Sequence, residues 1–172
     1  MKKLLLTLTL AAITIAAQAQ VKLHPSEVGT VEAITVTGLK IISGPKGQKR
    51  DMERFKALFL PDAQIGGVFY KGDSSLVRIS TVAQFADRNG PYYEQNGFYE
   101  TQLSLQVEQF GNLATAVQAY ETRTTPTGKV DARGVNTYQL VFDKGRWWIV
   151  SLLFTPETAK QPLPEKYLRQ GR

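Results

Sequence analysis

A long stretch of alternating residues, from Phe98 to Thr155, constrains the fold of this chain more than any other feature. In its first part Leu103, Leu105 and Val107 alternate with polar residues, which is the period of a strand with one buried face. Turn-forming residues divide the stretch at 111–112, 126–128 and 143–145. The pattern predicts four strands joined by three turns, folded as one curved antiparallel sheet.

The residues before this sheet predict two helices. Apolar side chains in 26–42 approximate a helical stripe, although several β-branched threonines weaken the pattern. The glycines and proline of 43–47 predict a turn. Asp51 then has the position of an N-cap, and apolar residues at helical spacing predict a second helix that Pro61 closes.

A short hairpin and a third helix follow. Residues 64–70 and 75–80 have the composition of strands, and a turn at 71–73 separates them. Thr81 begins a helix that Asn89-Gly90-Pro91 is expected to break. Together these elements predict an α+β fold in which about three N-terminal helices pack on a curved, mostly antiparallel sheet.

The first 19 residues resemble a secretory signal peptide. Lys2 and Lys3 form a basic start, residues 4–17 are apolar apart from threonines, and Ala17-Gln18-Ala19 places small residues where a signal peptidase reads. The apolar run is shorter than the roughly 18–20 residues of a membrane span. No cysteine follows it to carry a lipid. We therefore expect cleavage before Gln20, export to the periplasm or the medium, and no membrane anchor.

The remaining residues have the length of one domain with a single core. We expect a short tail at 20–25, the folded domain at 26–160, and an extended tail at 161–172 that contains two prolines. No cysteine is present, so no disulfide supports the fold. Lys and Arg number 21 against 15 Asp and Glu, but they are spread along the chain and interleaved with acids. Such a distribution is typical of a solvated surface and does not predict nucleic-acid binding.

The order of these elements resembles the cone-shaped fold of nuclear transport factor 2. Its bacterial relatives include the SnoaL-like polyketide cyclases and the ketosteroid isomerases. Within that superfamily four stretches resemble a group of bacterial proteins: 42–45 (Ile-Ser-Gly-Pro), 50–55 (Arg-Asp-Met-Glu-Arg-Phe), 58–63 (Leu-Phe-Leu-Pro-Asp-Ala) and 133–136 (Arg-Gly-Val-Asn). The resemblance implies a cystatin-like cone with an apolar pocket, and a homodimer packed through the sheet. It does not imply one activity, because this superfamily hosts several.

Metal and phosphate chemistry are not expected. The chain has no cysteine and a single histidine, His24, in the N-terminal tail, whereas zinc sites use several nitrogen or sulfur ligands. Residues 44–47 (Gly-Pro-Lys-Gly) lack the spacing of a phosphate-binding P-loop. The missing histidine also counts against the histidine-dependent dehydratases that share the cone fold. We therefore predict no metal and no cofactor.

Carboxylates and tyrosines remain as candidate functional groups. In ketosteroid isomerases a carboxylate base works with a Tyr and a protonated Asp as oxyanion donors in an apolar site. Glu100 is the candidate catalytic base or anchor here, because it follows aromatic residues at the entry to the sheet. The candidate ligand-binding residues are Tyr93, Phe98, Tyr120, Arg133, Asn136 and Tyr138.

Each candidate has a structural alternative. The tyrosines can be core residues with one polar end, and Glu100 a solvated strand residue. Arg133 can pair with Glu121 or Asp131 instead of a ligand. Asn136 can face either side of the sheet, because Gly134 could hold a β-bulge that changes the register.

The last strand is apolar on both faces. Strict alternation places Trp147, Ile149 and Leu153 on one face, and Trp148, Val150, Leu152 and Phe154 on the other. Both faces then need cover. Helices supply one cover, and a partner subunit or a filled pocket the other, so we expect a homodimer through a sheet face.

Three functions remain open on the sequence alone. The first is an exported domain whose cone binds a small hydrophobic ligand. The second is a cofactor-free isomerase, cyclase or lyase that transfers a proton next to a carbonyl. The third is a protein-interaction module with a filled cone. An open cavity of a few hundred Å³ would count against the third.

Overall fold

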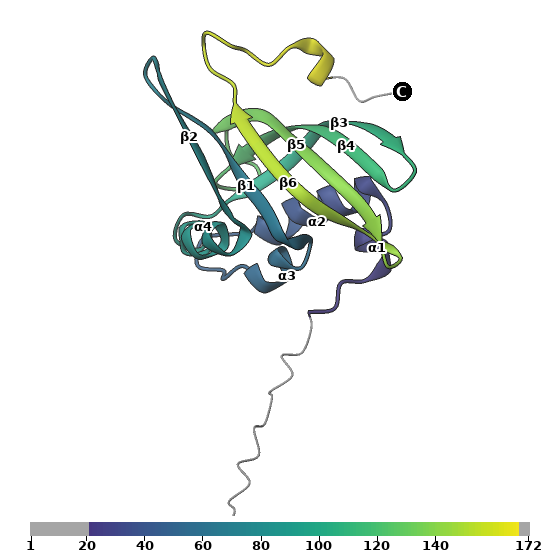
Figure 1. Ribbon diagram of the computed structural model, residues 1–172. Coiled ribbons are helices and arrows are strands. Elements are labelled where there is room, and N and C mark those ends of the chain that lie inside the picture. Colours follow the sequence, from purple (N-terminus) through teal and green to yellow (C-terminus); the bar gives the residue numbers. More distant parts are fainter. Residues whose placement is uncertain (1–20, 169–172) are drawn as a thin grey trace, which may run out of the picture.

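The computed structural model describes residues 21–168, in which one curved six-stranded sheet wraps around helices packed on its concave face (Figure 1). The strand order is β2-β1-β6-β5-β4-β3, and all neighbours are antiparallel except the parallel pair β1 and β6. The strands are β1 (Phe59–Lys71), β2 (Ser74–Thr81), β3 (Tyr99–Phe110), β4 (Leu113–Arg123), β5 (Ala132–Asp143) and β6 (Arg146–Pro156). The predicted α+β class is confirmed.

The helical cover begins with α1 (Pro25–Val28) and α2 (Val31–Ile42), which occupy most of the segment predicted as helix. Thr30 separates them, since its hydroxyl accepts a hydrogen bond from Ala33 N and caps α2. His24 caps α1 in the same way, through its ring and Ser26 N. The sole histidine of the chain therefore serves a helix end.

The second predicted helix is shorter than expected. Asp51 caps α3 (Met52–Lys56) as predicted, but Pro61 lies inside β1 rather than at the end of the helix. β1 begins before Pro61 because this segment pairs with β6. Phe59 pairs with Ile149, and Ile149 N donates to Leu58 O at 3.0 Å. β1 pairs with β2 only from Gln64 onward, so the missing N–H of Pro61 interrupts no hydrogen bond of that hairpin.

The third predicted helix is longer than expected. α4 (Val82–Asn96) continues through Pro91 and ends at Gly97, whose φ of 72° stops the helix. Pro91 deprives the carbonyl of Asp87 of its helical donor, but both residues are exposed and water can replace that bond. Tyr92 and Tyr93 are therefore helical residues, not part of a connection.

The sheet contains a bulge that the sequence pattern did not reveal. Leu140 pairs with Ile149 while Gln139 pairs with Ser151, which leaves Val150 as the extra residue of β6. The bulge places Leu152 and Phe154 on the concave face with Ile149, and Leu153 on the convex face. The strict alternation expected for this strand is wrong beyond Val150. No register shift occurs between β4 and β5 at Gly134, where a bulge had been considered.

The chain after β6 crosses the outside of the sheet. A short 3-10 helix, η1 (Glu165–Tyr167), contacts β3, where Ser104 Oγ donates to Tyr167 O and Gln106 Nε2 to Lys166 O. Residues 161–168, expected as an extended tail, thus include one helical turn with defined partners. No helix within 21–168 is long and apolar enough to cross a membrane. The expected signal peptide lies outside the described residues.

Candidate functional site

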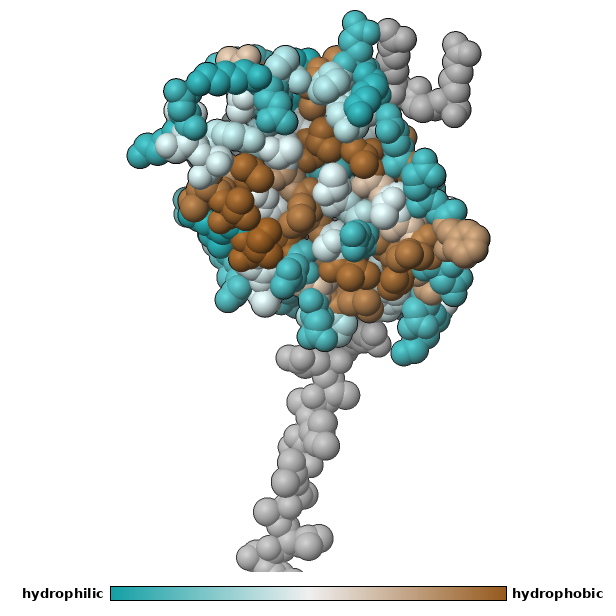
Figure 2. All heavy atoms as spheres, turned by 45° about the horizontal axis from the view of Figure 1, so that its top comes forward, coloured by the Kyte–Doolittle hydropathy of each residue, from teal (hydrophilic) through white to brown (hydrophobic). Residues whose placement is uncertain are grey.

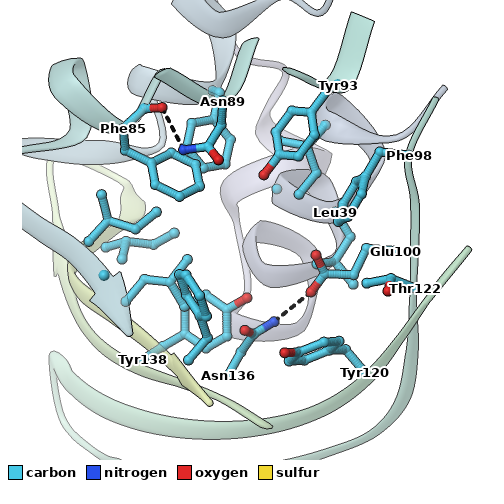
Figure 3. A pocket seen from close by; sticks show the side chains of 18 of the residues that line it. Leu39, Phe85, Asn89, Tyr93, Phe98, Glu100, Tyr120, Thr122, Asn136 and Tyr138 are labelled. Atoms are coloured by element: carbon cyan, nitrogen blue, oxygen red, sulfur yellow. Dashed lines mark hydrogen bonds between the residues drawn. The ribbon is translucent and has the colours of Figure 1, made fainter. Parts of the chain in front are cut away.

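A cavity of about 420 Å³ lies between the helices and the concave face of the sheet (Figure 3). Its wall is mainly aromatic and aliphatic, with contributions from α2, α3, α4 and all six strands of the sheet. Polar groups interrupt this wall at two places. Glu100, Asn136 and several tyrosines form one polar region, and Arg78, Arg88 and Asn89 lie in the other.

Six of the seven residues singled out from the sequence line this cavity. They are Tyr93, Phe98, Glu100, Tyr120, Asn136 and Tyr138. Arg133 does not line it. Its guanidinium instead pairs with both oxygens of Glu157, at 2.6 and 3.2 Å. Glu121 and Asp131 were the partners expected for Arg133. Glu121 pairs with Arg123, and Asp131 is in none of the ion pairs of the described residues. Arg133 thus forms an ion pair, as expected, but with a different carboxylate.

Local structure fixes the position of Glu100 at the start of β3. Gly97 ends α4 with a positive φ, and the next residue, Phe98, forms an isolated bridge with Gly44. The backbone N–H of Glu100 donates to Ser43 Oγ at 3.0 Å, just after α2 ends. Two helix ends therefore hold the strand entry, and the side chain of Glu100 turns into the cavity (Figure 3).

A hydrogen-bond network crosses three strands behind Glu100. Asn136 Nδ2 donates to Glu100 Oε1 at 2.9 Å and to Gln118 Oε1 at 3.2 Å. Tyr138 OH donates to the same Gln118 oxygen at 2.9 Å, and Gln118 Nε2 donates to Gln102 Oε1 at 2.8 Å. Gln118 is fully buried and both ends of its amide are satisfied. The network fixes the orientation of Asn136 and thus presents an N–H donor to Glu100.

The surroundings of Glu100 favour its neutral form. Burial raises the pKa of its carboxyl group to about 7, and the hydrogen bond from Asn136 opposes that rise. No cation pairs with Glu100 among the ion pairs of the described residues. The carboxyl group can therefore gain or lose a proton near neutral pH.

Three tyrosines around Glu100 remain protonated. Burial raises the pKa of Tyr93, Tyr120 and Tyr138 well above the ordinary value, and the nearby Glu100 charge adds to each rise. The hydroxyl group of Tyr138 already donates its hydrogen bond to Gln118. Tyr93 directs its hydroxyl from α4 into the cavity, where no described residue accepts a hydrogen bond from it (Figure 3). Tyr93 is thus a neutral donor available to a bound molecule.

Sequence reasoning missed two members of this network, Gln102 and Gln118. Gln118 follows Ala114 and Ala116 at a period of two on β4 and precedes Tyr120 on the same face. A polar amide in the middle of a small apolar stripe was the available signal. Asn89 was also missed; its amide nitrogen donates to Phe85 O at 2.9 Å, so its oxygen remains for the cavity (Figure 3).

The arrangement offers no metal site. Within residues 21–168, no group of three or more His, Cys, Asp or Glu could hold an ion. What the cavity does combine is an apolar wall, a carboxyl group that titrates near neutrality, and neutral hydroxyl and amide donors. Such a set can bind a small molecule through one polar atom and can move a proton at that place.

No protein-family model matches this sequence, and no curated protein matches it either. Solved structures do match. A cystatin-like protein of unknown function from Nostoc punctiforme shares 9% identity at a TM-score of 0.58, over 75% of this chain and 90% of that one. A proposed scytalone dehydratase from Novosphingobium aromaticivorans shares 12% identity at 0.54, over 74% and 82%.

A third structure extends the comparison. An NTF-2 like protein of unknown function from Silicibacter pomeroyi shares 16% identity at a TM-score of 0.51, over 73% of this chain and 92% of that one. These identities are low, so the likeness concerns architecture. It agrees with the helices on a curved sheet described above. The chain therefore has the cystatin-like fold of the nuclear transport factor 2-like proteins.

Proposed function

We propose that this protein binds a small, largely apolar molecule in the cavity and holds an uncharged polar atom of that molecule at Glu100. The observation that carries the proposal is the position of this carboxyl group in a mainly apolar wall, in hydrogen-bond contact with Asn136. Removing a carboxyl group from water in this way destabilises the folded protein, and such groups are concentrated at functional sites. The cavity volume lies within the roughly 300–1,000 Å³ range of small-molecule sites.

The polar atom of the ligand is a carbonyl or hydroxyl oxygen in this proposal. Protonated Glu100 and the hydroxyl of Tyr93 both donate hydrogen bonds, and both face the cavity. A carbonyl oxygen can accept from either group, and the apolar remainder of the molecule then lies against the phenylalanines of the wall. A filled cone that serves only protein interaction is the less favoured function, since the cavity is open.

A second candidate is proton transfer next to a carbonyl. Glu100 in its ionised form would take a proton from the carbon beside the carbonyl; the C–H electron pair would form a C=C bond, and the C=O π electrons would move to the oxygen. A neutral Tyr hydroxyl, that of Tyr93, would stabilise the enolate, and the proton would return to a different atom. The pKa of Glu100 near 7 favours this candidate, because such a group is populated in both forms at neutral pH.

The structural neighbour proposed as a scytalone dehydratase is compatible with an enzyme on this fold. Histidine cannot supply the base here, because His24 caps α1 outside the cavity. If the chain is an enzyme, Glu100 is the residue that carries proton transfer. The likeness of fold alone does not transfer the activity.

Calorimetric titration with 1-tetralone, an apolar bicyclic ketone, tests binding. We expect saturable binding by the wild-type protein and by Glu108→Gln, a control that removes an exposed carboxylate from the same strand. Glu100→Gln keeps a side chain of the same shape and should weaken binding by about tenfold, since the amide N–H is a weaker donor than the carboxylic O–H that it replaces. Equal binding by all three proteins would remove Glu100 from the site, and no binding at all would reject the proposal.

The same ketone separates the two candidates. In D₂O, proton transfer at Glu100 exchanges the hydrogens beside the carbonyl for deuterium, which NMR detects as loss of the C2 proton signal. An enzyme should exchange them faster than buffer alone and faster than Glu100→Gln. Binding without exchange above the buffer rate would leave the ligand-binding function and exclude proton transfer on this ketone.

A further inference from the structure

We propose that the natural ligand is an organic acid, whose carboxylate pairs with Arg78 and Arg88 at the cavity mouth while its apolar body extends toward Glu100. This inference rests on the proposed function and adds the chemical class of the ligand. It comes from the distribution of charge around the cavity. Two cationic side chains, Arg78 and Arg88, and one carboxyl group, that of Glu100, line it.

Arg78 and Glu100 lie on opposite edges of the sheet, and Arg88 lies on the helix between them. Arg78 is on β2 and Glu100 on β3, which are the two edge strands of the sheet. α4 connects these strands and covers the cavity, with Arg88 in its middle and Tyr93 close to its C-terminal end. Figure 1 shows β2 and β3 at the two edges of the curved sheet, so Arg78 and Glu100 come from strands that lie far apart in it.

The cavity opens to solvent beside the two arginines. Arg78 and Arg88 both line the cavity and both are exposed, which is possible only where the cavity meets solvent. Tyr92 and Phe69 line it as well, with exposed fractions of 55% and 39%. An apolar molecule that enters here with a charged end would leave that end in water beside the guanidinium groups.

Both guanidinium groups are available for a ligand. Within residues 21–168 neither makes an ion pair or donates a hydrogen bond. Arg78 lies 5.7 Å above the ring of Phe69, a contact that orients it over the cavity wall. A guanidinium group binds a carboxylate through two parallel hydrogen bonds.

The charges also determine the orientation of the ligand. Near neutral pH, ionised Glu100 repels a carboxylate from the inner polar region. The arginines attract it at the mouth. The body of the molecule, with any carbonyl or hydroxyl group, is then directed toward Glu100 and Tyr93.

The test compares 2-naphthoate with 2-naphthamide, which has the same size and shape but no charge. Calorimetric titration at pH 8 should give about tenfold tighter binding of the acid to the wild-type protein. Arg78→Gln and Arg88→Gln should each reduce that preference and the double variant should abolish it, while 2-naphthamide binding stays unchanged. Lys144→Gln, which removes an exposed cation from the β5–β6 turn, should keep the full preference.

The outcomes separate this inference from the function on which it rests. If both probes bind equally well, or if the preference survives in the double variant, the organic-acid inference is overturned and the cavity remains a ligand site. If neither these probes nor 1-tetralone bind, the proposed function fails and the inference fails with it. Added salt provides a second readout, because it should weaken the binding of 2-naphthoate and leave the binding of 2-naphthamide unchanged.

Discussion

Asn136 on β5 donates a hydrogen bond of 2.9 Å to Glu100 on β3 and reaches across the intervening strand β4 to do so. Gln118 on β4 holds the Asn136 amide from behind. The contact joins the edge of the sheet to its middle and gives the apolar cavity one ionisable group with a fixed partner.

Replacement of Glu100 should change how stability depends on pH. The carboxyl group has a pKa near 4.5 in the unfolded chain and about 7 in the folded protein, so its contribution is fully present below pH 4.5 and is lost as the pH rises through 7. The loss amounts to at most about 3 kcal/mol. Glu100→Gln stays neutral, so its free energy of unfolding should rise relative to that of the wild type as the pH increases from about 4 to about 8.

Urea denaturation at several pH values measures this difference. Glu108→Gln, on the same strand but exposed, serves as the control and should show no pH-dependent difference from the wild type. A constant offset between Glu100→Gln and the wild type from pH 5 to pH 8 would mean that Glu100 titrates like a solvated carboxylate.

Two Gly→Ala substitutions should have opposite effects. A Cβ atom at Gly134 would lie 2.3 Å from Thr155 O and 2.5 Å from Tyr120 OH, so it must displace backbone or the Tyr120 ring. We expect a loss of about 1–3 kcal/mol. A Cβ at Gly38, inside α2, would meet only Leu58 Cδ1 at 3.7 Å and should stabilise the helix by about 0.5–1 kcal/mol. Thermal unfolding of the two variants distinguishes them, and a neutral Gly134→Ala would refute the close packing of Tyr120.

Arg50 should be essential for stability although it contacts no carboxylate in the described part of the chain. It is 4% exposed, and its guanidinium donates to the carbonyls of Ile42, Gly44, Gln48 and Tyr93. A lysine ammonium group cannot donate to all of these carbonyls, so Arg50→Lys should lower the free energy of unfolding by about 3 kcal/mol, as measured by chemical denaturation. Arg54→Lys, in a partly exposed pair with Glu27, should cost less than about 1 kcal/mol. Similar costs for both would show that the Arg50 hydrogen bonds matter little.

The convex face of the sheet is the proposed homodimer surface. It carries Val77, Ile79 and Leu153 with exposed fractions of 64%, 43% and 41%, around a shallow apolar groove. Figure 2 shows several hydrophobic areas on the face of the molecule that is turned toward the viewer. Light scattering at micromolar concentration should give a dimer, and Leu153→Arg should give a monomer. Phe110→Arg, at the tip of the β3–β4 hairpin, should leave the dimer intact; a monomeric wild type would contradict the proposal.

The sequence predicted those elements that local residues determine. The hairpins at 71–73, 111–112 and 143–145 follow from turn residues between alternating strands, and Asp51 and Thr81 are helix caps whose partners lie three residues away. Tertiary contacts decided the rest. Pro61 lies in a strand because β6 pairs with the residues before it, and the Val150 bulge depends on the register of β5.

The candidate site was predictable to a similar extent. The alternation in β4 and β5 places Tyr120, Asn136 and Tyr138 on the face that lines the cavity, whereas Tyr93, Phe98 and Glu100 reach it from the end of α4 and the entry to β3. The partner of Arg133 was not predictable, because Glu157 lies beyond the last strand and meets β5 only through the fold. The apolar stripe around Gln118 marks it as unusual, but its role depends on Asn136 and Tyr138 beside it, which only the pairing of β4 with β5 reveals.

The most direct test of the account is an NMR map of 1-tetralone binding to the ¹⁵N-labelled protein. The side-chain amide signals of Asn136 and the backbone signals of Phe98 and Glu100 should shift as the ketone is added, because these groups surround the polar end of the cavity. Signals from Val77 and Leu153 on the convex face should stay in place. Shifts confined to the convex face, or no shifts at millimolar ketone, would contradict the claim that the cavity with Glu100 is the ligand site.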